Sequence, residues 1–240
     1  MTTKKFTTFF MATLALILAL SSCKKVVGNG PTITESRNVS AFNKIKLEIA
    51  ADLEFNQNPS TNVSISAQEN ILKVIRTRVV DGEMIIDLEP GTILGRHDDI
   101  KLNIDASGVY SFLLSGSGKV EINDDIAENS VILKVSGSGD ILVDGVHCQD
   151  LHTEISGSGK IEIANGTVDE HHVKISGSGD VKTENVESRV VNTTTSGSGD
   201  TKVFATETLN VKISGSGNVY YRGTPAISAS ISGSGEVKPI

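Results

Sequence analysis

The chain has 240 residues, with 22 Lys and Arg against 29 Asp and Glu, for a formal net charge of −7. This acidic balance argues against a nucleic-acid-binding protein, because such proteins normally present a basic patch to the phosphates. Two cysteines exclude a disulfide framework, and aromatic residues at 4% leave few rings on which sugars or bases could stack. The excess of 23 glycines needs an explanation, and their positions decide the predicted fold.

Residues 1–22 have the pattern of a bacterial lipoprotein signal peptide. Lys4 and Lys5 give a basic start, and residues 9–20 are apolar except for Thr13. This run is too short to cross a hydrocarbon core of ~30 Å as a helix. It ends in Leu20-Ser21-Ser22-Cys23, which resembles the lipobox, so we predict acylation of Cys23 and a protein that is anchored to a membrane without spanning it. An ordinary cleaved signal, or an N-terminal anchor helix, with an incidental cysteine is the alternative.

The next segments have little repetition. Residues 23–37 are predicted to be a lipid-anchored tether. Residues 38–112 are predicted to form irregular opening coils of the domain that spans residues 38–240. Strand-like runs separated by turn signals occur here at Ile45–Ile49, Val63–Ile65, Met84–Leu88 and Ile100–Ile104. Residues 66–78 are compatible with a short helix.

Ser-Gly-Ser-Gly occurs seven times between residues 115 and 235, at intervals of 18–21 residues. A fixed period near 20 is typical of solenoids, in which each repeat packs against its neighbours. The residues that flank each copy alternate between apolar and polar, as in strands with one buried face. We therefore predict an all-β fold, a parallel β-helix of about 18–21 residues per coil, with regular coils over residues 112–240.

The glycines of the tetrapeptides are predicted to line a corner that is too tight for side chains. Simple alternation points these glycines inward and the serine hydroxyls outward, whereas a bulge within the tetrapeptide would reverse this, and both arrangements stay open. The corner glycines are Gly116, Gly118, Gly137, Gly139, Gly157, Gly159, Gly177, Gly179, Gly197, Gly199, Gly215, Gly217, Gly233 and Gly235.

Stacking of the coils also predicts ladders of side chains. Lys134, Glu154 and Lys174 would alternate in charge along one stack, which supports the register. His152 and His172 would stack on adjacent coils, but no third ligand shares their column. Polar stacking on an exposed face is therefore the simpler interpretation.

The sequence predicts no cofactor and no metal site. Apart from His152 and His172, the residues that come nearest to one are Asp180 and Asp200, adjacent like charges that a Ca²⁺ ion could bridge. No catalytic residue is predicted either. The acid pairs at 124–125 and 169–170 lack evident partners in a groove. Cys148 follows His147 directly, and adjacent residues of a strand face opposite ways.

Several segments together resemble the head-GIN domain family of bacterial proteins, which are secreted or lipid-anchored and described as auto-transporter adhesins. They are Gly28-Asn29-Gly30, Glu35-Ser36-Arg37, Val39-Ser40, Phe42, Ile45, Ala51-Asp52-Leu53 with Gln57, and the recurrent Ser-Gly-Ser-Gly. The resemblance covers about residues 28–240. It implies a right-handed β-helical fold, and it carries over no catalytic residue.

We therefore expect a non-enzymatic lipoprotein of the bacterial cell envelope, anchored at the outer membrane, with an adhesin-like module that contacts another macromolecule or a glycan. A glycan-binding or polysaccharide-active β-helix protein is the alternative, and a structural envelope protein is the second alternative. The ligand, the membrane face and the oligomeric state stay open.

Overall fold

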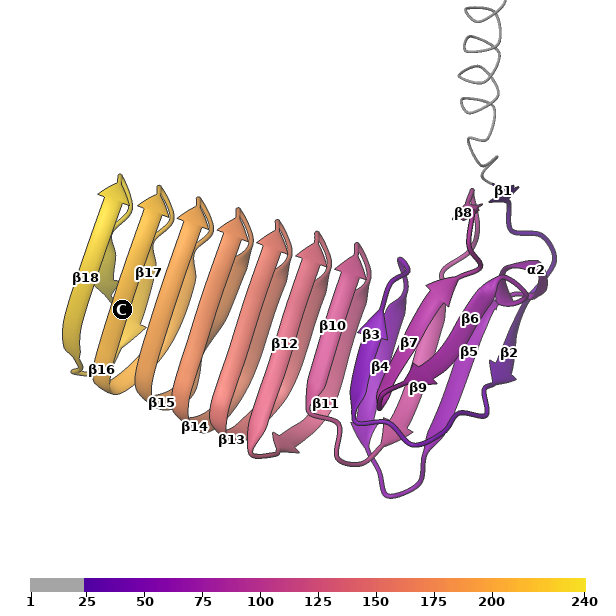
Figure 1. The fold of residues 1–240 in the computed structure, drawn as a ribbon, viewed down its shortest axis with the longest axis horizontal. Helices are drawn as coiled ribbons and strands as arrows, with labels where there is room; N and C mark the ends of the chain where they lie inside the picture. The colour runs from indigo at the N-terminus through magenta and orange to yellow at the C-terminus, as the bar shows by residue number, and fades with distance from the viewer. Residues whose placement is uncertain (1–23) are drawn as a thin grey trace, which may run out of the picture.

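The computed structural model describes residues 24–240, and the predicted signal peptide and Cys23 lie outside this part of the chain. The predicted parallel β-helix is confirmed: the strands of the repeat region stack side by side, all pointing the same way (Figure 1). No helix within residues 24–240 is long and apolar enough to cross a membrane. The strands of the repeat region are β10 (Ser111–Gly116), β11 (Lys119–Ala127), β12 (Ser130–Gly137), β13 (Asp140–Gly157), β14 (Lys160–Gly177), β15 (Asp180–Gly197), β16 (Thr201–Gly215), β17 (Val219–Arg222), β18 (Ala226–Gly233) and β19 (Val237–Pro239).

The seven tetrapeptides stack in register. Ser136 pairs with Ser156, Ser156 with Ser176, and the same column continues to Ser232. Each long strand bends within the coil. Between β13 and β14 the pairing covers residues 140–143, 145–148 and 150–157 of β13, and it is interrupted at the bends between these segments. The regular period of the sequence is therefore the length of one coil.

The corner glycines take the inward arrangement. In the copy at residues 156–159 the two serines are exposed and Gly159 is buried. Gly157 has φ +135°, a conformation that side chains rarely adopt, and a Cβ there would lie closer than 3.0 Å to the backbone of Gly137. A Cβ on Gly159 would lie 2.7 Å from Val135 Cγ1 of the preceding coil. Glycine is thus required because the coils touch backbone to backbone at this corner.

The inside of the solenoid is filled by stacked side chains. Ile155, Ile175 and Ile213 are buried in one column, and Thr195 occupies the same column between the last two. Apolar and β-branched residues suit this inner surface, because they pack well across neighbouring strands. Buried threonines also include Thr153, Thr183, Thr193 and Thr201, so the core becomes more polar toward its C-terminal coils.

The N-terminal part adds two parallel coils and an antiparallel layer. β3 (Lys44–Leu47) and β4 (Asp52–Gln57) pair with β10 and β11, and on their other side with β7 (Glu83–Leu88) and β9 (Lys101–Ala106). The remaining strands of this sheet pair antiparallel: β2 (Thr32–Ser36) with β5 (Asn62–Gln68), β5 with β9, and β6 (Ile75–Val80) with β7. β1 (Lys24–Val26) and β8 (Thr92–Leu94) form a separate parallel pair.

The structure adds two details about this part. The opening coils are not stacked in chain order, because the coil of β3 and β4 lies between that of β7 and β9 and that of β10 and β11. The helix expected within residues 66–78 is reduced to α2 (Glu69–Leu72), with β5 running into this range and β6 starting within it. Isolated helices of this length are unstable, so its position depends on the packing of Ile71 and Leu72 in the core.

Candidate functional site

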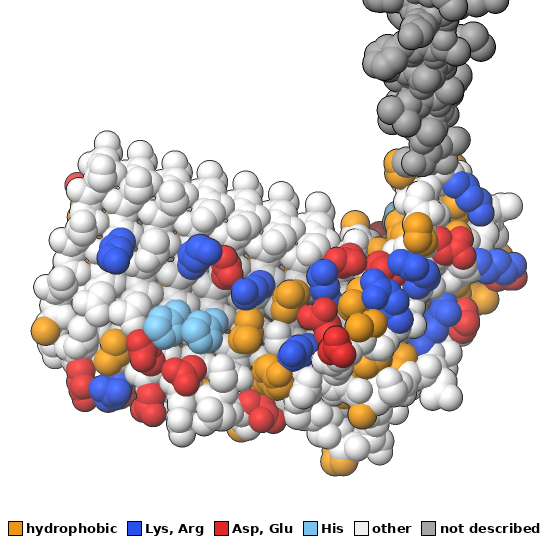
Figure 2. Space-filling view, in the orientation of Figure 1, with side chains coloured by type: hydrophobic (Ala, Val, Ile, Leu, Met, Phe, Trp, Pro, Cys, Tyr) orange, Lys and Arg blue, Asp and Glu red, His pale blue; other side chains and the backbone are white. Residues whose placement is uncertain are grey.

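The strands that lead into each tetrapeptide share one outward-facing surface, which we call the ladder face. It consists of two columns of side chains that point away from the core. The first column contains Ile132, His152, His172, Asn192, Asn210 and Ser228, and the second contains Lys134, Glu154, Lys174, Thr194, Lys212 and Ser230. The space-filling view shows charged and histidine side chains on one side of the solenoid and a mostly uncharged surface near the ends of these strands (Figure 2).

The predicted charge ladder is present on this face. Glu154 lies between two lysines, 3.1 Å from Lys134 Nζ and 2.7 Å from Lys174 Nζ. The hydrogen bond from Lys174 lowers the pKa of Glu154, and Lys134 lowers it further. These pairs contribute little to stability because they are largely solvated, but they fix the positions of three long side chains across neighbouring coils.

A second column of alternating charges in the repeat region does not form ion pairs between coils. Lys119, Asp140 and Lys160 stand in register, as their spacing implies. The lysines nevertheless form ion pairs with Glu121 and Glu162 on their own strands. Residues two apart on a strand point the same way, which makes this alternative available.

His152 and His172 do stack, as predicted. Their rings are nearly parallel, with an interplanar angle of 8° and centroids 4.8 Å apart. Burial, together with repulsion from His172, lowers the pKa of His152, so this imidazole is neutral at physiological pH. The two rings line an open groove of about 330 Å³ together with Lys134, Glu154 and Lys174.

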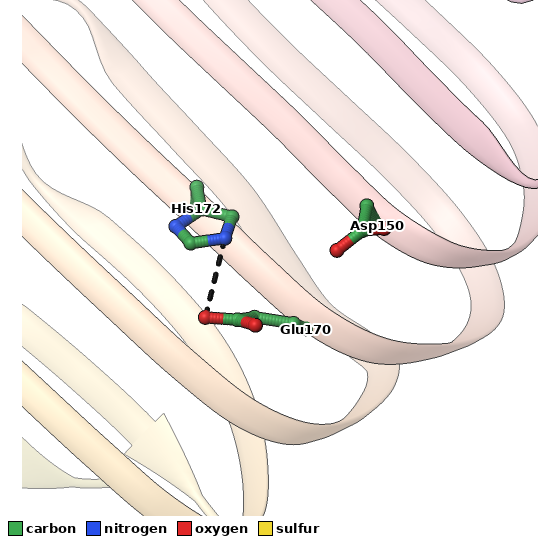
Figure 3. Close-up of side chains that lie close together, drawn as sticks. All are labelled: Asp150, Glu170 and His172. Atoms are coloured by element: carbon green, nitrogen blue, oxygen red, sulfur yellow. Dashed lines mark ion pairs between the residues drawn. The ribbon is translucent and has the colours of Figure 1, made fainter.

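The structure adds two carboxylates beside these rings. Asp150 and Glu170 are register partners and lie two residues before His152 and His172. The ligand atoms of Asp150, Glu170 and His172 all lie within 4.8 Å of one another (Figure 3). Glu170 Oε1 is 3.2 Å from His172 Nε2 and accepts a hydrogen bond of 2.8 Å from Asn192 Nδ2.

Sequence reasoning missed this cluster because it looked for further ligands within the histidine column. The missing donors stand in the neighbouring outward column. The signal was the spacing itself: Asp150-x-His152 recurs 20 residues later as Glu170-x-His172. On stacked coils this repetition gives a two-by-two array of carboxylates and imidazoles.

Asp180 and Asp200, which the sequence analysis considered for Ca²⁺, instead accept hydrogen bonds from the backbone of the next coil. Asp180 Oδ1 accepts the backbone N–H of Asp200 at 2.9 Å, and Asp200 Oδ1 accepts the backbone N–H of Asn218 at 2.8 Å. Asn218 Oδ1 in turn accepts the N–H of Glu236 at 3.1 Å. These hydrogen bonds link successive coils at the residue that directly follows each Ser-Gly-Ser-Gly corner.

Among the remaining reactive groups, Cys148 shares a groove of about 400 Å³ with Asp169, Glu187 and Glu207. Burial raises the pKa of the Cys148 thiol to about 12, so this thiol is protonated and a poor nucleophile. His147 Nδ1 lies 2.8 Å from Thr167 Oγ1, and His147 Nε2 lies 3.5 Å from Asp125. Asp124 accepts the backbone N–H of Gln57 at 2.8 Å.

Stacked parallel coils and in-register glycine corners define a parallel β-solenoid with an exposed polar ladder face. The chain belongs to the family described as "Putative auto-transporter adhesin, head GIN domain", whose model matches residues 41–225. The predicted family resemblance is therefore confirmed.

Solved structures from Bacteroides and Parabacteroides species have the same fold. A putative adhesin from Bacteroides fragilis is 24% identical with a TM-score of 0.82, over 90% of this chain and 100% of that chain. A putative lipid binding protein from Parabacteroides distasonis is 26% identical with a TM-score of 0.74, over the same shares of the two chains. A putative adhesin from Parabacteroides merdae is 23% identical with a TM-score of 0.73, over 90% of this chain and 99% of that chain. A search of curated proteins found no match.

Proposed function

We propose that this chain is a non-enzymatic lipoprotein of the bacterial cell envelope whose solenoid binds another macromolecule or a surface, as an adhesin does. The observation that carries the proposal is the ladder face, on which polar side chains repeat at the spacing of the coils. The membership of an adhesin-named family supports this function. It also supports a location at the cell envelope.

The ladder face suits a repetitive ligand. Asn192 Oδ1 accepts a hydrogen bond of 2.9 Å from Asn210 Nδ2, and neighbouring coils place such groups ~4.8 Å apart. Asn192, Thr194, Asn210 and Lys212 line a shallow groove across β15, β16 and β18. Amide, hydroxyl and ammonium groups of this kind recognise hydroxyls and carboxylates, so glycans are the class of ligand that we favour.

The N-terminus supplies the anchor in this proposal. Cys23 would carry the acyl chains, and β1 begins at the next residue, so the membrane surface would lie near the pair of β1 and β8. We place the anchor in the outer membrane. A neighbour named a putative lipid binding protein makes a lipid a second ligand class that deserves a direct test.

The enzymatic alternative gains nothing from the predicted acid pair at 124–125, whereas Asp169, Glu187 and Glu207 do line one groove, in which Arg189 pairs with Glu207. A β-helical polysaccharide lyase or glycosidase needs acids that converge on one groove. Asp124 and Asp125 are instead occupied by Gln57 and His147. A purely structural envelope protein is the remaining alternative, and it predicts no ligand for the ladder face.

The test is binding of the purified full chain, carrying Cys23→Ala, to glycan arrays, lipid vesicles and bacterial and host cells. We expect saturable binding to one glycan class that Asn210→Arg abolishes, because the new side chain would block the groove. Asn165→Arg makes the same change at an exposed position outside the ladder face and should leave binding unchanged. Loss of binding in both variants, or in neither, would contradict the ladder face as the binding surface.

The anchor needs a separate experiment. The full chain expressed with labelled palmitate should incorporate the label and fractionate with the outer membrane. Cys23→Ala should lose both properties, and Cys148→Ala should keep them. Membrane association that survives Cys23→Ala would overturn the lipoprotein proposal.

A further inference from the structure

We propose that Asp150, Glu170 and His172 form a binding site for one divalent transition-metal ion, such as Zn²⁺. This proposal does not rest on the proposed ligand-binding function, although His172 also belongs to the ladder face. It rests on the juxtaposition of three ligand atoms from two neighbouring coils, all within 4.8 Å of one another. Figure 3 shows the three side chains projecting from adjacent bends of the solenoid.

The chemistry of the donors fits such an ion. Zn²⁺ binds imidazole nitrogen and carboxylate oxygen at about 2.0–2.2 Å, usually with four ligands. Two carboxylates and one imidazole match this preference and leave a position for water. Small side-chain rotations would bring the three atoms onto one ion, because all three side chains are partly exposed and free to move.

The electrostatics of the bend also favours a cation. Asp150 and Glu170 are like charges directly opposite each other on paired strands, an arrangement that is destabilising by itself. Within residues 24–240, the Asp150 carboxylate has no ion-pair partner within 4.0 Å. The nearby lysines at 134 and 174 pair with Glu154 and do not neutralise these acids. A bound divalent ion would remove the repulsion.

The surroundings hold two of the ligands in place. Asn192 donates a hydrogen bond to Glu170 Oε1, and the ring of His152 lies flat against that of His172. Partners of this kind orient the groups that bind a metal and raise its affinity. The ring of His152 thus restrains the ring of His172.

The test is calorimetric titration of the purified full chain, carrying Cys23→Ala, with ZnCl₂. We expect one ion per chain. Asp150→Asn, Glu170→Gln and His172→Ala should each weaken binding at least about tenfold. Asp169→Asn removes an equal charge at the residue beside Glu170, outside the cluster, and His147→Ala removes a histidine elsewhere, so both should bind as the parent does.

A structural readout accompanies the titration. X-ray absorption at the zinc edge should show oxygen ligands and one imidazole, and the imidazole contribution should disappear in His172→Ala. The substituted side chains are outward-facing, so melting curves without metal should match the parent and confirm folding. No binding at millimolar zinc, or binding that all three ligand variants retain, would overturn the site.

Discussion

Gly157 lies directly against Gly137 of the preceding coil, so close that a Cβ on Gly157 would be within 3.0 Å of the carbonyl oxygen of Gly137. The same relationship joins Gly177 to Gly157 and Gly197 to Gly177. Contact between copies therefore requires glycine at this position, in addition to the positive φ within each copy.

Gly157→Ala should strongly destabilise the protein. The substitution combines an unfavourable φ of +135° with a backbone clash, and we expect a loss of about 2–5 kcal/mol in the free energy of unfolding. Gly91→Ala is the matched control, because Gly91 also has positive φ, +75°, but nothing lies within 4 Å of the added Cβ. It should cost only about 1 kcal/mol. Urea denaturation of both variants checks this, and equal losses would contradict the close approach of the coils.

His171 should make the protein sensitive to acid. The side chain is fully buried, its Nε2 lies 3.1 Å from Thr153 Oγ1, and its Nδ1 has no partner among the described residues. Burial lowers its pKa to about 3, from 6.5. Between these values the unfolded chain binds a proton that the folded chain does not, so the free energy of unfolding should fall as the pH decreases from 6.5 toward 3.

His171→Leu tests this contribution, because its register partners Leu151 and Val191 are apolar. The variant should be more stable by about 1–3 kcal/mol at neutral pH, since a buried unsatisfied nitrogen is removed. Its advantage should grow at mildly acidic pH. Urea denaturation at several pH values measures the difference, and an advantage independent of pH would argue that His171 is not buried in its neutral form.

Asp200 should stabilise its corner as a hydrogen-bond acceptor and not as a charge. Its Oδ1 accepts both the backbone N–H and the side-chain amide of Asn218, at 2.8 and 3.1 Å. Asp200→Ala should cost about 1–2 kcal/mol, because a partly buried N–H loses its partner. Asp200→Asn keeps the acceptor oxygen and should cost less than half as much. Thermal unfolding compares the two, and equal costs would point to the negative charge instead.

Glu154→Gln should have only a small effect. The variant loses its ion pairs with Lys134 and Lys174, which are largely solvated, so we expect a loss of less than about 1 kcal/mol. Because the pKa of Glu154 is lowered in the folded protein, this contribution is present above pH 4.5 and is lost as the pH falls through the lowered value. Molar salt should abolish the difference between variant and parent. A difference that salt leaves intact would indicate a packing role.

Some features were visible in the sequence because they depend on neighbouring residues and on a constant period. The alternation around Ile155 and Ile161 predicts strands, and the recurrence of Ser-Gly-Ser-Gly every 18–21 residues predicts stacked coils. Once the coils stack, the ladder of Lys134, Glu154 and Lys174 follows from their spacing of 20 residues. The lipidation of Cys23 stays a prediction from its motif.

Other features depend on which surfaces meet in three dimensions. Whether the serines or the glycines face the core was open until the exposure of Ser156 and Ser158 and the burial of Gly159 decided it. The coil of β3 and β4 lies between two others, because the chain continues through β5, α2 and β6 to β7 and β9 on one side and only then to β10 and β11 on the other side. This part of the sequence has no regular repeat from which that order could be predicted. Asp150, Glu170 and His172 meet because two outward columns lie side by side on stacked bends. The repeating unit can thus be recognised from local alternation and glycine spacing along the chain. The contacts between columns and the order of the first coils cannot, because they arise from packing between distant parts of the chain.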